Sequence, residues 1–247
     1  MIIIIIILII IILLLSNRQN VENFTLEKLE LYLINLEKRK DRFEITNNLL
    51  KDYNFYNVIR FPAVLGKNIS KEDLVKFVEP SAMKSILNNY RTEHHELSYG
   101  AVGCYLSHVN IWKKLEYDNL DYAIIFEDDA LPNFSFFELK DIIKNYVPND
   151  WDIVLFGGLY NNNTKINDYI IKILTFYQTH AYIINKKGAL KLLSKAFPIK
   201  KQIDSWLSDL ASNDDIIIYG ITKNKWVQNE NIINTDIQTV IKNDFSN

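Results

Sequence analysis

Short apolar runs alternate with amphipathic stretches between residues 28 and 238, and this alternation constrains the fold more than any other feature. Apolar runs bounded by polar residues predict strands, and apolar spacings of three and four predict helices. Alternation of the two implies an α/β domain, a mainly parallel sheet flanked by helices. We expect strands at 29–36, 58–64, 122–126, 151–156, 180–184 and 216–219, helices at 39–50, 103–115, 137–146, 187–196 and 205–210, and loops at 161–165 and 230–235.

The N-terminal segment differs from the rest, because Met1 is followed by an unbroken run of Ile and Leu up to Leu15. A helix of this length reaches about 22 Å, short of the roughly 30 Å hydrocarbon core of a bilayer. No Lys or Arg precedes the run and no A-x-A-like cleavage site follows it. Residues 1–20 are therefore either a membrane anchor or signal-like segment, or a low-complexity extension of a cytoplasmic protein. We take 28–240 as the folded domain.

The composition excludes several classes of protein. The chain has 28 basic and 30 acidic side chains, and a net charge of -2 does not supply the basic face that nucleic acid requires. The seven glycines form neither a dinucleotide fingerprint nor a phosphate loop. One cysteine, Cys104, excludes an intrachain disulfide and a metal site built from several cysteines. The richness in Ile, Asn and Lys is typical of an AT-rich genome, such as that of a virus.

Three adjacent carboxylates, Glu127, Asp128 and Asp129, directly follow the apolar run 122–126. Open α/β sheets bind ligands at the carboxyl ends of their strands, which is where this triplet would lie. In an extended segment Glu127 and Asp129 would point to the same side and Asp128 to the other. Two carboxylates held in this way suit Mn²⁺ or Mg²⁺, which would also bind substrate phosphates. The alternative is an acidic turn in solvent.

Seven stretches of the chain, in their order and spacing, resemble glycosyltransferase family 25, the lipooligosaccharide and procollagen galactosyltransferase group. They are YLINLEKRKDRF at 32–43, FPAVLGKNI at 61–69, LSYGAVGCYLSHVNIW at 97–112, AIIFEDDA at 123–130, WDIVLFGG at 151–158, QTHAYIINKKGALKLL at 178–193 and IDSWL at 203–207. The resemblance implies a single GT-A-like, Rossmann-type domain, a nucleotide-sugar donor and a Mn²⁺-supported acidic motif at 127–129. Leu65 and Ala101 stand where the family usually has acidic residues.

Polar residues after the first strand are candidates for binding the nucleotide. Guanidinium groups of Arg39 and Arg42 are suited to phosphates, and the resemblance favours Asn35 and one of the arginines. The alternative is a solvated helix face with local ion pairs.

Two histidines have distinct predicted roles. His108 lies in line with Cys104 on the core-facing stripe of 103–115, which predicts a buried, hydrogen-bonded imidazole, and the resemblance adds a role in shaping the donor site. Ser107 and His108 are adjacent on a helix and so do not form a nucleophile and base by themselves. His180 opens the strand 180–184, where it would complete the coordination of the cation, contact the acceptor or serve the structure.

The catalytic base is assigned to Asp204, which precedes the helix 205–210. A carboxylate there would remove the proton from an acceptor hydroxyl, although capping of the helix would explain the residue equally well. Asp152, Asp214 and Asp215 are weaker candidates.

We therefore expect a glycosyltransferase that moves galactose or glucose from a UDP-sugar to a hydroxyl of a glycan or of hydroxylysine, with inversion implied by the resemblance. The cation would be held by Glu127, Asp129 and His180, and the nucleotide by Asn35, Arg39, Arg42 and Glu127. The alternative is an inactive, membrane-tethered carbohydrate-binding protein, which Leu65 and Ala101 suggest. The missing Gly-rich loop argues against a sugar-nucleotide pyrophosphorylase.

Overall fold

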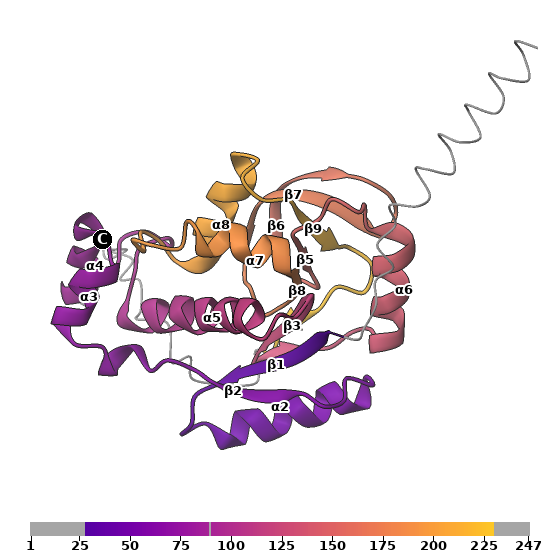
Figure 1. Cartoon of the computed structure of the whole chain (residues 1–247), viewed down its shortest axis with the longest axis horizontal. Coiled ribbons are helices and arrows are strands. Elements are labelled where there is room, and N and C mark those ends of the chain that lie inside the picture. Colours follow the sequence, from indigo (N-terminus) through magenta and orange to yellow (C-terminus); the bar gives the residue numbers. More distant parts are fainter. Residues whose placement is uncertain (1–27, 89, 230–247) are drawn as a thin grey trace, which may run out of the picture.

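An eight-stranded sheet forms the centre of the computed structural model, which describes residues 28–88 and 90–229 (Figure 1). The strand order is β2-β1-β3-β8-β5-β9-β7-β6. The strands are β1 (Leu29–Asn35), β2 (Ile59–Pro62), β3 (Tyr122–Glu127), β5 (Ile153–Leu155), β6 (Leu159–Lys165), β7 (Ile170–Tyr177), β8 (Ala181–Asn185) and β9 (Ile218–Ile221). A separate antiparallel pair joins β4 (Ala130–Leu131) to β10 (Val227–Gln228).

The sheet is mainly parallel but contains two reversed strands. β1 runs parallel to β2 and β3, and β5 runs parallel to β9. β8 is antiparallel to both β3 and β5, and β7 is antiparallel to both β9 and β6. Relative to β1, five strands of the sheet therefore run in the same direction and only β8 and β7 oppose it. The predicted α/β class with a mainly parallel sheet is confirmed.

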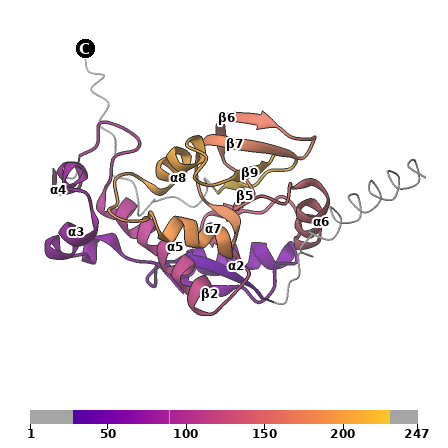
Figure 2. The ribbon, with the colours of Figure 1, turned by 45° about the horizontal axis from the view of Figure 1, so that its top comes forward.

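Helices cover both faces of the sheet and so produce three layers (Figures 1 and 2). Residues of α5, α7 and α8 share one buried cluster with the sheet, and residues of α2 and α6 share the other. Figure 2 shows α3 and α4 at one end of the molecule, beyond α5. The helices are α2 (Lys40–Asp52), α3 (Lys71–Phe77), α4 (Met83–Asn88), α5 (Tyr99–Tyr117), α6 (Phe136–Tyr146), α7 (Lys186–Leu193) and α8 (Ile203–Ser212), with short 3₁₀ turns η1 (Gly66–Asn68) and η2 (Pro80–Ala82).

The central position of β3 in the sheet explains why its sequence is continuously apolar. Ala123 and Ile125 belong to the cluster under α5, whereas Ile124 and Phe126 belong to the cluster under α2 and α6. All four are fully buried, because side chains alternate across a sheet that is covered on both faces. The carboxyl end of this buried strand is the place where the acidic triplet emerges.

Polar caps set the beginnings of several helices. Ser98 accepts a hydrogen bond from the backbone of Ala101, so α5 begins at Tyr99, four residues before the predicted start. The alternative interpretation of Asp204, as the cap of α8, is wrong. That helix begins at Ile203 after Gln202, and Asp204 lies within its first turn.

The prediction of a loop at 161–165 is also wrong, because these residues belong to β6, the edge strand of the sheet. β6 pairs with β7, and the two form a hairpin along one border (Figure 2). The Asn and Thr side chains of β6 are exposed, whereas β7 buries Ile170, Ile173 and Phe176. Pairing with a well-anchored neighbour therefore overrides the low strand propensity of asparagine.

Three predictions fall on residues that the structure does not describe. They are the anchor or extension at 1–20, the loop at 230–235 and the last part of the domain 28–240. Among the described helices, none is both long enough and apolar enough to cross a bilayer.

Candidate active site

A cavity lies at the carboxyl end of β3. Its wall combines the acidic triplet with the end of β1, the segment that follows β2 and residues of α5. The lining residues are Ile34, Asn35, Leu36, Arg42, Ala63, Val64, Leu65, Gly66, Gly100, Cys104, Ser107, His108, Glu127, Asp128 and Asp129. Four segments that are distant in the sequence thus meet around three carboxylates.

Glycine allows α5 to approach the segment after β2. A Cβ atom on Gly103 would lie 2.4 Å from the carbonyl oxygen of Val64, and one on Gly66 would lie 1.7 Å from the carbonyl oxygen of Tyr99. Ser107 adds a hydrogen bond, because its Oγ accepts from the backbone N–H of Val64 at 2.9 Å. This close packing fixes one wall of the cavity, and it accounts for Ser107 without any nucleophilic role.

Arg42 is the counter-ion of the triplet. Its Nη2 lies 2.6 Å from Oδ1 of Asp128 and 3.4 Å from Oδ2 of Asp129. Asn35 donates from Nδ2 to Oδ2 of Asp128 at 2.6 Å. The expectation that Asp128 points away from Asp129 is therefore wrong. Strand β3 ends at Glu127, so the alternation of an extended chain does not continue through the triplet.

Asp129 carries the least satisfied carboxylate of the site. Its Oδ1 is buried and has no hydrogen-bond partner among the described residues. Burial, and then the negative charge of Glu127, raise the pKa of Asp129 to about 7, although Arg42 opposes the shift. A buried carboxylate oxygen without a hydrogen-bond partner is rare in native proteins. A role in binding a cation is one recognised explanation.

Glu127 is held by Thr179 and His108. Thr179 donates from Oγ1 to Oε1 of Glu127 at 2.7 Å, and Nε2 of His108 lies 3.4 Å from the same oxygen. Burial favours the neutral acid, but the contact with His108 and the hydrogen bond from Thr179 outweigh it and hold the pKa of Glu127 below its usual value. Glu127 is therefore ionised at neutral pH.

The predicted nucleotide ligand Asn35 is engaged by the protein itself. Its Nδ2 group donates to the carbonyl of Arg39 at 2.9 Å as well as to Asp128, and its Oδ1 accepts from Arg60 at 2.6 and 2.9 Å. Asn35 is 1% exposed and orients the carboxylate of Asp128. Sequence reasoning missed Arg60, which lies in β2 and matches no motif.

Comparison with known proteins identifies the family. The model of glycosyltransferase family 25 (LPS biosynthesis protein) matches residues 28–207. The chain belongs to glycosyltransferase family 25. The observed sheet flanked by helices agrees with the α/β class expected for this family.

Several curated proteins are similar to this family 25 chain. A glycosyltransferase 25 family member of Anopheles gambiae is 31% identical over 196 residues, which cover 74% of this chain and 32% of the relative. Procollagen galactosyltransferase 1-A of Xenopus laevis is 30% identical, with 70% of this chain and 29% of the relative covered. Putative glycosyltransferase R655 of Acanthamoeba polyphaga mimivirus is 31% identical over 63% of this chain and 45% of its own length. The matched region thus spans about a third of the first two relatives.

Two solved structures are distantly similar to the family 25 chain. A197 from STIV covers 81% of this chain and 85% of its own at 12% identity, with a TM-score of 0.44. The apo form of mouse xyloside xylosyltransferase 1 covers 79% of this chain and 73% of its own at 12% identity, with a TM-score of 0.41.

Cys104 and His108 of the family 25 chain approach Glu127 from α5. Potential ligand atoms of Cys104, His108 and Glu127 all lie within 4.8 Å of one another. Burial, and then the charges of the acidic residues, raise the pKa of Cys104 well above its usual value, so its thiol is protonated at neutral pH. A protonated thiol is a poor metal ligand, because the thiolate is the form that binds metals.

His180 lies next to the triplet through the backbone. Its carbonyl accepts from the N–H of Glu127 at 2.8 Å, and its imidazole is fully buried. Burial lowers the pKa of His180, so the ring is neutral at pH 7. Neither ring nitrogen makes a hydrogen bond of standard geometry with the described residues. A neutral imidazole of this kind has the chemistry of a metal ligand.

Asp204 does not line the cavity. Its Oδ2 accepts from the backbone N–H of Gln178 at 3.2 Å and its Oδ1 accepts from that of Ser205 at 2.7 Å. The negative charge of Asp204 helps to raise the pKa of Cys104, as do the charges of the triplet. Asp204 therefore shares the electrostatic environment of the site.

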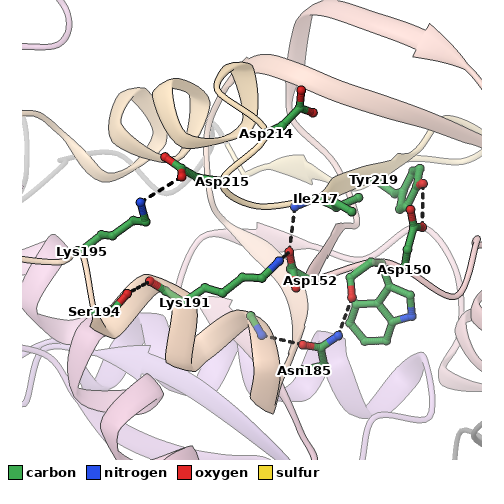
Figure 3. A network of polar contacts seen from close by, with 12 residues as sticks. Asp150, Asp152, Asn185, Lys191, Ser194, Lys195, Asp214, Asp215, Ile217 and Tyr219 are labelled. Carbon is green, nitrogen blue, oxygen red and sulfur yellow. Dashed lines mark hydrogen bonds and ion pairs between the residues drawn. The ribbon is translucent and has the colours of Figure 1, made fainter.

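The weaker base candidates precede β5 and β9 in the chain, and Figure 3 shows the polar contacts around them. Asp152 precedes β5, which runs in the same direction as β3, so it marks the amino ends of the strands. Its Oδ2 accepts from Lys191 and from the backbone N–H of Ile217. Asp214 and Asp215 pair with lysines at 3.2 and 2.9 Å. These three aspartates support the structure and not the site.

The predicted phosphate ligands Arg39 and Arg42 differ in their surroundings. Arg42 is 7% exposed and is committed to the carboxylates of Asp128 and Asp129. Arg39 precedes α2, where its Nη2 pairs with the exposed carboxylate of Asp41 at 3.2 Å. Only Arg39 therefore has an exposed partner that a phosphate can replace without leaving a buried charge unpaired.

Proposed function

We propose that this protein transfers a hexose, galactose or glucose, from a UDP-sugar to a hydroxyl of a glycan or of hydroxylysine. Membership of family 25 and the similarity to a procollagen galactosyltransferase support this class of reaction. The observation that carries the proposal is the buried Asp129 oxygen without a partner, next to an ionised Glu127 in one cavity. Such a pair is suited to hold a divalent cation against a diphosphate.

The residues present fit a divalent cation. Glu127 and Asp129 would supply two hard oxygen donors from the wall of the cavity. His180 would supply a neutral nitrogen from outside the cavity wall, because it is not among the lining residues. The cation, when bound, supplies Lewis-acid stabilisation of the diphosphate leaving group. Mn²⁺ suits this mixed set of ligands better than Mg²⁺, because Mg²⁺ favours oxygen ligands.

Other residues position charge in the proposed reaction. Arg42 holds Asp128 in place and opposes the rise that burial causes in its pKa, and Asn35 fixes its second oxygen. Arg39 would exchange its contact with Asp41 for a donor phosphate. Asp204 is the proposed base that takes the proton of the acceptor hydroxyl, and inversion follows if that hydroxyl attacks from the face opposite the leaving diphosphate.

Release of UDP tests the proposal. Purified protein is incubated with UDP-galactose or UDP-glucose and Mn²⁺, with and without glycan and hydroxylysine acceptors. We expect turnover with one donor, and a loss of at least 100-fold in Asp129→Ala. Asp215→Asn is the matched control, because it removes a carboxylate at the far end of the sheet. An undiminished rate in Asp129→Ala contradicts the cation assignment.

The same assay distinguishes an enzyme from an inactive carbohydrate-binding protein. Leu65 lines the cavity in place of the acidic residue that the family resemblance leads one to expect. Binding of UDP-sugar without turnover, for every donor and acceptor, would favour the inactive alternative.

A further inference from the structure

Three buried side chains form a continuous line that ends on Glu127. Trp112 and His108 lie one turn apart on α5, and Tyr182 faces them from β8; none of the three is more than 1% exposed. Nε1 of Trp112 lies 3.0 Å from the Tyr182 hydroxyl oxygen, and Nδ1 of His108 lies 2.9 Å from it. The other ring nitrogen of His108 lies 3.4 Å from Oε1 of Glu127, a long contact that falls short of standard hydrogen-bond geometry, and it has no other hydrogen-bond partner among the described residues.

The chemistry of the groups decides the direction of each hydrogen bond. An indole N–H only donates, so the Tyr182 oxygen accepts from Trp112. Within the described residues, Nδ1 of His108 is the acceptor in reach of the Tyr182 hydroxyl hydrogen. A buried hydroxyl that could not donate would be strongly unfavourable. Nδ1 is therefore the acceptor, and the proton of the neutral imidazole is on Nε2, toward Glu127.

We propose that Trp112 and Tyr182 are positioning residues that hold His108 in its Nε2–H tautomer, so that His108 donates to Glu127. Thr179 donates to the same oxygen, Oε1, at 2.7 Å. Two donors on Oε1 fix the carboxylate and leave Oε2 for a ligand in the cavity that Glu127 lines. The inference rests on the proposed function, because it treats Glu127 as part of the donor site.

This tautomer also decides between two interpretations of the Cys104, His108 and Glu127 cluster. A metal at this cluster would require an unprotonated Nε2, because a ring nitrogen coordinates through its lone pair. The hydrogen bonds from Trp112 to Tyr182 and from Tyr182 to His108 place a proton on that nitrogen. His108 is thus a hydrogen-bond donor to Glu127 and not a metal ligand.

Tyr182→Phe removes the hydroxyl that links Trp112 to His108. Tyr105→Phe is the matched control, because Tyr105 is also buried, lies on α5 and donates its hydroxyl to the carbonyl of Ala196 at 2.9 Å. Both variants lose one buried hydroxyl, so a merely structural role predicts similar losses of stability and no difference at the site.

The first measurement is the tautomer of His108, read from imidazole ¹⁵N shifts of the metal-free protein and assigned with His108→Gln. We expect Nε2–H in the wild type and in Tyr105→Phe, and a mixture of tautomers in Tyr182→Phe. Nδ1–H or an imidazolium in the wild type at neutral pH would overturn the inference, as would an unchanged tautomer in Tyr182→Phe.

The second measurement is the Mn²⁺-dependent affinity for UDP, by calorimetry. We expect a loss of about tenfold or more in Tyr182→Phe and in His108→Ala, the range typical of residues that orient metal ligands, and less than twofold in Tyr105→Phe. His108→Gln, which keeps an N–H donor near the Nε2 position, recovers most of the affinity lost in His108→Ala. Should Tyr182→Phe fail to fold, the two His108 variants supply the same comparison, and equal affinities would overturn the inference.

The two measurements separate this inference from the proposed function. If the wild type binds no UDP with Mn²⁺, the proposed function fails. The tautomer of His108 then still decides whether Trp112 and Tyr182 position it. If the wild type binds UDP but Tyr182→Phe matches Tyr105→Phe, the positioning role fails and the proposed function stands.

Discussion

Arg42 and Asp129 illustrate what single residues reveal only in the folded chain. The position of Arg42 after the first strand predicted a residue near the site, which is correct, but not its partners. It is paired with Asp128 and Asp129, which are far away in the sequence, and a pairing of this kind leaves no local pattern. The triplet itself was predictable, because three carboxylates directly after a buried strand are conspicuous. The raised pKa and the unpartnered oxygen of Asp129 were not predictable.

Asp129→Asn should raise the free energy of unfolding of the metal-free protein at pH 8. The gain should be smaller at pH 5. The folded pKa of Asp129, about 7, lies above the value of about 3.9 in an unfolded chain. The ionised carboxylate therefore destabilises the fold. This cost is absent below pH 3.9, grows as the pH rises and is complete above about 7. Asparagine does not ionise, and Arg42 keeps its contact with Asp128 at 2.6 Å.

Urea unfolding in EDTA at the two pH values measures this difference. Asp214→Asn is the control, because Asp214 is an exposed partner of Lys172. A difference between wild type and Asp129→Asn that does not change with pH would contradict the expected titration. Gain of stability together with loss of transfer would show that Asp129 is retained for function.

Elements whose own residues are buried were predictable, and elements that depend on a neighbour were not. β3 is fully buried along 123–126, so its apolar run identifies it. β6 contains consecutive asparagines and forms by pairing with β7. The start of α8 was misplaced because Asp204 has the chemistry of a cap, yet its carboxylate accepts from Gln178 instead. Local propensity thus fails where a long-range contact decides the conformation.

The capping box of α6 gives a prediction at this scale. Ser135 accepts from the backbone N–H of Glu138 at 3.2 Å, and the Glu138 carboxylate accepts from the backbone N–H of Ser135 at 2.7 Å. Ser135→Ala should lower the free energy of unfolding by about 1 kcal/mol at pH 7. The hydrogen bonds from Ser135 lower the pKa of Glu138. The stabilisation by the ionised Glu138 carboxylate is therefore fully present above about pH 4.3. It is lost as the pH falls through the lowered pKa of Glu138 in the folded protein.

Urea unfolding at pH 7 and pH 3.5 checks the effect, which should shrink at the lower pH. Ser194→Ala is the control, since Ser194 is an exposed serine that donates to the carbonyl of Lys191 and caps no helix N-terminus. Equal losses in the two variants would argue against the box. UDP affinity should stay unchanged in both, because neither serine lines the cavity.

The whole molecule combines a predictable layered core with a cavity that no single segment contains. Continuous apolar strands and amphipathic helices predict three layers, and two buried clusters on opposite faces of the sheet agree. The reversal of β8 and β7 was not predictable, because a central strand is equally apolar in either direction. The cavity joins residues near 35, 65, 104 and 128, so its geometry depends on the complete topology.

UDP together with Mn²⁺ should therefore stabilise the molecule against global unfolding. A ligand in this cavity contacts four segments that separate only when the sheet and α5 come apart. At 100 times its Kd, a ligand that binds only the folded state adds about 2.7 kcal/mol. For a domain of about 200 residues this corresponds to a rise in Tm of roughly 5–10 °C. Either component alone should give a much smaller shift, because the cation offsets the charge between carboxylates and diphosphate.

Thermal unfolding with UDP, Mn²⁺, both, or uridine with Mn²⁺ measures this coupling. Uridine lacks the diphosphate, so its shift should stay near that of Mn²⁺ alone. Asp129→Asn should lose most of the combined shift, whereas Asp214→Asn should keep it, since Asp214 lies outside the cavity. Equal shifts with UDP and uridine, or a full shift in Asp129→Asn, would mean that the nucleotide binds without the acidic triplet, and the cation would then have to be placed elsewhere.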